Sequence, residues 1–354
     1  MTNSYFQLLK PLKMGDMILK NRIIMAPLTR CRAFDRIPNE LMLEYYCQRA
    51  SAGLILTEAT SIHPMGVGYP RTPGIWSDEQ IAGWKKITQA LHQKDGKIFC
   101  QLWHVGRISH PFYLDGKLPL APSPVAAIGN VSLVRPPIAY PVPRALEMAE
   151  IKEIVAQYKK AASNAFQSNF DGVEIHAANG YLIDQFLQDS TNHRTDEYGG
   201  SVSNRCRFLM EIVDAAIEVW GASKVGVHLA PRCDSHSMGD SNAKELFTYI
   251  ARELSIKKIA FIFTRESLKE PRLSPLMRKE FQGIFIANEG HDFESANLLL
   301  ERNEADAVAF GKYFISNPDL PFKIEKNISP TPFQSETFYG ETNVGYTDYP
   351  VHKI

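Results

Sequence analysis

The sequence lacks an excess of charge of either sign. Its 39 lysines and arginines balance 39 aspartates and glutamates, so the formal net charge of the 354 residues is zero. Dedicated nucleic-acid binders and polybasic membrane modules carry a basic excess, so neither class of protein is expected. The balanced charge leaves self-association into a homo-oligomer open.

Cysteine is also scarce, and its spacing favours no metal or disulfide chemistry. The five cysteines lie at positions 31, 47, 100, 206 and 233, an odd number without a CxxC pair. We therefore expect neither a disulfide framework nor a zinc ribbon, but reduced thiols in a cytoplasmic protein.

No apolar run is long enough to cross a membrane. The longest uncharged stretch, residues 118–134, contains Pro119, Pro122 and Pro124 and is not a plausible membrane helix. The first ten residues show no basic start followed by an apolar run, so no signal peptide is predicted. What remains is an ordinary globular composition, 44% hydrophobic and 22% charged, that can form a large core.

Eight short apolar runs predict buried strands. They are continuous rather than alternating, which is typical of a parallel sheet covered on its outer face. Helical patterns lie between most of them, most clearly at 78–94, 147–167 and 203–220. The eight runs are 22–26, 53–58, 97–103, 172–176, 225–229, 259–264, 283–287 and 307–311.

Eight strands alternating with helices predict an α/β fold, one (β/α)8 TIM barrel that spans residues 1–354 as a single domain. A doubly wound open sheet is the second choice, because no glycine-rich turn follows the first strand. Residues 12–19 predict an N-terminal hairpin that plugs the barrel. Residues 104–146 form a proline-rich insertion after strand 3, too long for an ordinary connection, and we expect it to cap the catalytic face.

Three polar side chains follow the predicted fourth strand, where a barrel exposes its catalytic groups. His176 and Asn179 can direct two donors at one oxygen, which suits a carbonyl that gains negative charge in the transition state. Tyr181 has a phenol with an ordinary pKa of about 10, so it keeps its proton until a strong base removes it. The plain alternative is that His176 and Tyr181 only pack in the core.

Further polar groups follow other strands. Gln101 and Trp103 point to the same side of the third strand, so an amide and an indole either reach the lumen together or fill the barrel. Residues 288–290 follow the seventh strand, and Gly311 and Lys312 follow the eighth. Loops at these two places often bind phosphate through backbone N–H groups.

A set of short motifs is spread over nearly the whole chain. They lie at 26–29, 68–69 with 72–76, 101–107, 176–186, 309–311, 317–320, and 338–339 with 345–350. In this order they resemble the Old Yellow Enzyme family of FMN-dependent ene-reductases, including its N-ethylmaleimide reductase-like members. The resemblance implies FMN at the barrel mouth and reduction of activated C=C bonds in α,β-unsaturated carbonyl or nitro compounds. Hydride would come from NADPH or NADH, a choice that the sequence leaves open.

The resemblance also implies roles for single residues. His176 and Asn179 would bind the substrate's carbonyl oxygen, and Tyr181 would supply the proton. The residues expected to line the substrate pocket are Tyr69, Trp103 and Tyr339. Those expected to bind FMN are Ala26, Pro27, Leu28, Thr29, Ala59, Gln101, His228, Glu289, Gly290, Gly311 and Lys312.

Two positions depart from the family pattern. His228 stands where the family commonly has an arginine beside the flavin ring, and Arg232 is close enough in sequence to be its substitute. Lys312 stands where the family usually has an arginine, so phosphate is still neutralised but bidentate geometry is lost.

Other functions remain as alternatives. A metal-dependent hydrolase could use His63, His104, His176 and His228 near strand ends, although no HxH or HExxH pair is present. A Schiff-base aldolase needs a lysine at a strand end, and only Lys312 is near one. A non-enzymatic flavin-binding barrel would not need the proton donor that the His-Asn-Tyr set provides.

Overall fold

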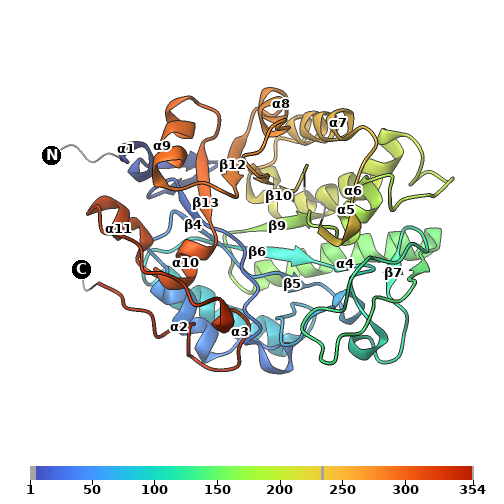
Figure 1. The fold of residues 1–354 in the computed structure, drawn as a ribbon, viewed down its shortest axis with the longest axis horizontal. Helices are drawn as coiled ribbons and strands as arrows, with labels where there is room; N and C mark the ends of the chain where they lie inside the picture. Colours follow the sequence, from blue (N-terminus) through green and yellow to red (C-terminus); the bar gives the residue numbers. More distant parts are fainter. Residues whose placement is uncertain (1–4, 233–234, 353–354) are drawn as a thin grey trace.

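Eight short strands of buried residues pair in parallel and close into a barrel within residues 5–232 and 235–352, the part of the chain that the computed structural model describes (Figure 1). In order around the barrel they are β3 (Ile23–Met25), β4 (Leu54–Leu56), β6 (Ile98–Trp103), β9 (Gly172–Ala177), β10 (Val225–Leu229), β11 (Phe261–Arg265), β12 (Ile284–Asn288) and β13 (Ala307–Phe310). Pairing of β13 with β3 closes the ring, and the short β5 (Thr60–Ser61) extends β4 along β6. The predicted barrel is confirmed, with each strand within two residues of its expected run.

Helices surround the strands on the outside (Figure 1). They are α1 (Phe6–Leu9), α2 (Glu40–Gln48), α3 (Asp78–His92), α4 (Met148–Gln167), α5 (Leu182–Leu187), α6 (Val202–Trp220), α7 (Ala243–Ile256), α8 (Ser274–Glu280), α9 (Phe293–Glu301), α10 (Lys312–Ser316) and α11 (Leu320–Glu325). The start of α3 shows how the sequence sets a boundary: the Ser77 side chain accepts from the Gln80 N–H, and the Gln80 side chain reaches back to the backbone of Ser77. None of the helices in the described residues is long and apolar enough to span a membrane.

A hairpin closes the amino-terminal end of the barrel, as predicted. It consists of β1 (Leu12–Met14) and β2 (Met17–Leu19), which pair antiparallel. Met14 and Leu19 are buried in one apolar cluster with the inward-facing Phe99 and Phe261. Gly15 turns the hairpin with a φ of +57°, next to Ser223 just before β10. The hairpin therefore supplies the floor of the barrel core.

The proline-rich insertion lies between β6 and α4. It contains the short parallel pair β7 (Leu120–Ala121) and β8 (Arg144–Ala145) and appears at the lower right of the ribbon (Figure 1). Val131 and Tyr140 pack in one cluster with Trp103 at the end of β6. Arg107 ties the insertion down by donating to Val125 O at 3.0 Å and to His236 O at 2.7 Å. The insertion therefore caps the carboxyl end of β6.

The carboxyl-terminal tail folds back over the segment that follows β3. The rings of Tyr346 and Tyr45 stack at 4.1 Å between centroids. Arg30 donates to Gly345 O at 2.7 Å, and Arg32 donates to Phe338 O at 2.9 Å. Because these arginines follow β3, the tail lies beside the carboxyl end of the barrel.

Four cysteines lie in the described residues, and all are free thiols: Cys31, Cys47, Cys100 and Cys206. Cys233 lies outside the described residues.

The hairpin floor generates a stability prediction. Leu19→Ala should lower the free energy of unfolding by about 2–5 kcal/mol, because truncating a buried leucine removes apolar contacts and leaves a cavity. Ile18→Ala on the same hairpin is the control: its side chain is 70% exposed, so the change should stay below about 0.5 kcal/mol. Urea unfolding measures both variants, and equal losses would contradict the role of the hairpin as a floor.

Candidate active site

Four side chains converge at the carboxyl ends of β6, β9 and β10. The rings of His176 and His228 stack with centroids 5.0 Å apart, because β9 and β10 pair with these two residues in register. The Tyr181 ring meets His176 edge-on at 5.1 Å, and Trp103 meets Tyr181 edge-on at 5.0 Å. The structure thus brings together four residues that the sequence places on three separate segments.

Gln101 connects this cluster to the barrel interior. Its Nε2 donates to Glu174 Oε2 at 2.7 Å and lies 3.2 Å from His228 Nδ1. An amide nitrogen can only donate, so in this arrangement His228 Nδ1 accepts and the ring proton sits on Nε2. His228 Nε2 is buried without a partner among the described residues. Sequence reasoning missed Glu174, although strand alternation places it on the same face as His176.

Burial keeps the two histidines neutral. It lowers the pKa of His176 to about 3 and the pKa of His228 well below its ordinary value, and the charge of Arg265 acts in the same direction on both. Burial also raises the pKa of Glu174 to about 8. Near neutral pH each imidazole is therefore an uncharged ring with one N–H to donate.

Tyr181 keeps its proton in the same environment. Burial, followed by the nearby Tyr69, raises its pKa well above the ordinary value. The two hydroxyls are 2.8 Å apart, and Trp103 packs against both rings. Tyr339, half-exposed on the tail, is near enough to contribute to the raised pKa of Tyr181. The three residues expected to line the substrate pocket thus lie around the expected proton donor.

Asn179 lies on the turn between β9 and α5. Its φ is +58°, and its backbone carbonyl accepts a hydrogen bond from His236 Nδ1 at 2.8 Å. Its side-chain Oδ1 accepts from Arg265 Nη1 at 3.1 Å. Arg265, the last residue of β11, also forms an ion pair with Glu289. Sequence reasoning missed Arg265, because the predicted strand ended one residue before it.

Arg232, suggested above as the substitute for an arginine at position 228, lies elsewhere. It is exposed and donates to Pro271 O at 2.6 Å. That suggestion is wrong, because the cation whose charge acts on His176 and His228 is Arg265. Arg265 lies on β11, which pairs with the strand of His228, a relation that sequence distance does not reveal.

The remaining residues expected to bind a cofactor lie after β4, β3, β13 and β12, which are consecutive neighbours in the barrel. Pro27, Leu28 and Thr29 are half-buried, and Ala26 and Ala59 are buried. Gly311 lies so close to Leu28 that a Cβ atom added at position 311 would be 3.3 Å from Leu28 Cδ2. Gly290 has a φ of +82°, and Lys312 is exposed beside the Phe333 ring. Glu289, in contrast, directs its carboxylate to Arg265.

The four histidines of the metal hypothesis do not gather around one point, although His176 and His228 stack on each other. His104 Nδ1 accepts from the Gly106 N–H at 3.1 Å, and His63 Nδ1 accepts from the Met65 N–H at 3.2 Å. Within residues 5–232 and 235–352, no three His, Cys, Asp or Glu side chains gather to hold a metal ion.

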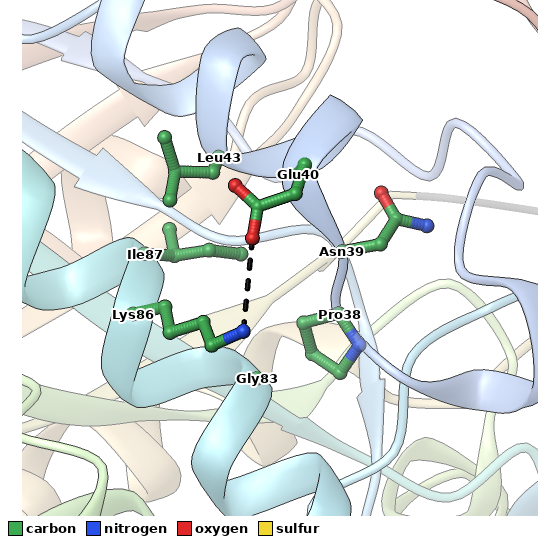
Figure 2. Close-up of a pocket in the computed structure, with 7 residues that line it drawn as sticks. All are labelled: Pro38, Asn39, Glu40, Leu43, Gly83, Lys86 and Ile87. Atoms are coloured by element: carbon green, nitrogen blue, oxygen red, sulfur yellow. Dashed lines mark ion pairs between the residues drawn. The ribbon is translucent and has the colours of Figure 1, made fainter.

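A cavity of about 260 Å³ lies apart from this site, between α2 and α3 on the outside of the barrel (Figure 2). Its charged groups, Glu40 and Lys86, form an ion pair at 3.7 Å. It is lined by Pro38, Asn39, Glu40, Leu43, Gly83, Lys86 and Ile87, none of which is a predicted site residue.

The buried Glu174 generates a pH prediction. Its pKa is about 8 in the fold against an ordinary 4.5, so the folded chain holds a proton that the unfolded chain releases. The contribution of this carboxyl to stability is therefore present below pH 4.5 and is lost as the pH rises towards 8. Glu174→Gln removes this loss. The difference in unfolding free energy, variant minus wild type, should therefore grow by up to about 1.4 kcal/mol for each unit by which the pH rises between 4.5 and 8. Urea unfolding at several pH values measures the difference, and a constant difference would contradict the assignment.

Comparison with known proteins gives consistent results over nearly the whole chain. A family model described as the NADH:flavin oxidoreductase / NADH oxidase family matches residues 7–330. 12-Oxophytodienoate reductase 1 of Oryza sativa subsp. japonica is 41% identical over 97% of this chain and 92% of that protein. The flavin oxidoreductase hxnT of Emericella nidulans is also 41% identical, over 97% of each protein.

Solved structures are similar in sequence and in fold. The old yellow enzyme homologue from Zymomonas mobilis superposes with a TM-score of 0.95 at 45% identity, covering 97% of this chain and 99% of that one. Morphinone reductase in complex with tetrahydroNAD superposes with a TM-score of 0.94 at 44% identity, covering 98% of both chains.

Proposed function

Because the chain belongs to the Old Yellow Enzyme family of FMN-dependent NADH:flavin oxidoreductases, we propose that His176, Asn179 and Tyr181 perform the protein's part in reducing an activated alkene. The protein is an NAD(P)H-dependent flavin ene-reductase, which acts on α,β-unsaturated carbonyl or nitro compounds. The comparisons give no support to a metal-dependent hydrolase or to a non-enzymatic flavin-binding barrel. The observation that carries the proposal is the edge-on contact of the Tyr181 ring with the His176 imidazole, 5.1 Å between centroids, at the barrel mouth. Burial there lowers the pKa of the imidazole and raises the pKa of the phenol.

The residues at the mouth fit FMN. Two buried donors, His228 Nε2 and Trp103 Nε1, have no partner among the described residues, and such groups are costly unless a ligand or water pairs with them. When bound, FMN supplies the hydride chemistry, from the nicotinamide to the β carbon of the alkene. The residues proposed to hold it are Ala26, Pro27, Leu28, Thr29, Ala59, Gln101 and His228 at the ring, and Glu289 (through its backbone), Gly290, Gly311 and Lys312 at the phosphate.

The substrate's oxygen is proposed to lie between His176 and Asn179. Since the His176 imidazole is neutral, it polarises the carbonyl with a hydrogen bond and does not give up a proton. The Asn179 amide adds a second donor from the turn above. Two fixed donors stabilise the negative charge that grows on this oxygen as hydride reaches the β carbon.

Tyr181 is proposed to protonate the α carbon. Its phenol keeps the proton until the strongly basic enolate carbon forms, and the Tyr69 hydroxyl at 2.8 Å orients it. Trp103, Tyr69 and Tyr339 give the alkene flat apolar walls. The insertion, packed against Trp103 through Val131 and Tyr140, shields this side of the mouth from water.

We further propose that the whole chain acts as one domain, with residues 104–146 as its cap; its ends, 1–4 and 353–354, lie outside the described residues. A cytoplasmic location is proposed from the free thiols at Cys31, Cys47, Cys100 and Cys206. NADPH is proposed as a donor alongside NADH.

The visible absorption spectrum of the purified protein tests the function. Flavin bands should bleach anaerobically when NADPH or NADH is added and return when cyclohexenone follows. A colourless protein that does not take up added FMN would refute the cofactor assignment. Bound flavin that bleaches but is not reoxidised by the enone would refute the substrate class.

Tyr181→Phe separates the two half-reactions. The variant should slow reoxidation by cyclohexenone by about two orders of magnitude or more, which is the usual contribution of a positioned proton donor. Flavin reduction by the nicotinamide needs no proton from Tyr181 and should stay within about twofold of wild type. Stopped-flow absorbance measures both steps, and equal slowing of the two would remove Tyr181 from its proposed role.

A further inference from the structure

We propose that Arg265 is a positioning residue that turns the Asn179 amide so that its nitrogen faces the substrate's oxygen, and that Glu289 holds Arg265 in place. The inference rests on the proposed role of Asn179 and adds two residues to it.

Two edges of the Arg265 guanidinium donate hydrogen bonds, one to Glu289 and the other to Asn179. Its Nε donates to Glu289 Oε2 at 3.0 Å, and its Nη2 lies 3.4 Å from Glu289 Oε1. This side-on pairing leaves Nη1 to donate to Asn179 Oδ1 at 3.1 Å. Because the guanidinium is planar and rigid, a carboxylate on one edge fixes the direction of the other nitrogen.

Arg265 decides which way the Asn179 amide faces. The oxygen and nitrogen of an amide have nearly the same shape, so an asparagine can present either one to a ligand. A guanidinium has five donors and no acceptor, so only the oxygen can face it favourably. The nitrogen must then point away from Arg265, and no described residue accepts a hydrogen bond from Asn179 Nδ2.

The Asn179 backbone is held as well. Its φ of +58° belongs to the left-handed region, which asparagine tolerates better than most residues. The hydrogen bond from His236 Nδ1 to its carbonyl oxygen, at 2.8 Å, fixes this turn. With the backbone held on one side and the amide oxygen on the other, the amide nitrogen has one direction left.

The ion pair has little value as a source of stability. The side chains of Arg265 and Glu289 are 36% and 39% exposed, and pairs in such positions contribute about 0–1 kcal/mol. The proposed role of the ion pair is to orient the Arg265 guanidinium, and through it the Asn179 amide. Without Arg265, an Asn179 amide turned around would place its oxygen against the substrate's oxygen and repel it.

The test compares Arg265 with Arg232, an exposed arginine that donates to Pro271 O. In the FMN-loaded enzyme, Arg265→Met should lower kcat/KM for cyclohexenone about tenfold, the effect of losing roughly one hydrogen bond to a charged group. It should also weaken binding of the unreactive ketone cyclohexanone by a similar factor. The change in flavin absorbance measures this binding. Arg232→Met removes the same charge without contact to Asn179 and should leave both values within about twofold. Flavin reduction by the nicotinamide should be unchanged in the Arg232→Met variant.

A double-mutant cycle distinguishes positioning from a general effect of charge. In an Asn179→Ala background, Arg265→Met should have no further effect, because no amide remains to be oriented. An equal loss in both backgrounds, or no loss in either, would overturn the proposal. If Arg265→Met does not fold, Glu289→Gln is the second variant, because it keeps Arg265 but weakens the ion pair that holds the guanidinium in place. Glu289→Gln should also weaken cyclohexanone binding. Unchanged binding would again overturn the proposal.

The outcome for the wild-type enzyme keeps the two proposals apart. Wild-type protein that binds no FMN, or whose reduced flavin cyclohexenone cannot reoxidise, would refute the proposed function itself. If the wild-type enzyme turns over and the Arg265→Met variant behaves like it, only the role of Arg265 would be refuted.

Discussion

The in-register pairing of parallel strands in a closed barrel is the constraint on which the whole site depends. Parallel strands end at the same edge, so residues far apart in the chain reach one mouth. The pairing of β9 with β10 sets His176 against His228, and β6 brings Gln101 and Trp103 beside them. The hairpin floor closes the other end, so this mouth is the open end of the core.

Burial at that mouth decides the protonation states on which the chemistry depends. The same loss of water that keeps His176 and His228 uncharged keeps the Tyr181 phenol protonated and raises the pKa of Glu174. A neutral donor can polarise a carbonyl without giving up its proton, and the proposed mechanism therefore assigns proton transfer to the phenol. One physical cause thus separates the two roles.

The charge at the mouth is arranged differently from the pattern that the sequence resemblance led us to expect, an arginine at position 228. With His228 neutral, the positive charge that acts on the site comes from Arg265 on the neighbouring strand. Glu289 balances that charge, and Asn179 uses the remaining guanidinium edge. A single arginine therefore acts both on His228, proposed to lie at the flavin ring, and on Asn179, proposed to bind the substrate's oxygen.

The sequence by itself determined the barrel, its hairpin and cap, and the residues at the ends of β6 and β9, because buried parallel strands leave continuous apolar runs and the polar motifs follow them directly. It did not determine the partners of those residues. Glu174 is hidden inside an apolar run, Arg265 follows the predicted end of its strand, and Arg232 is nearer to His228 in the chain but is exposed and bound to Pro271. Only the tertiary structure decided these pairings, because the distance between two side chains across a barrel depends on strand order and register and not on their separation along the chain.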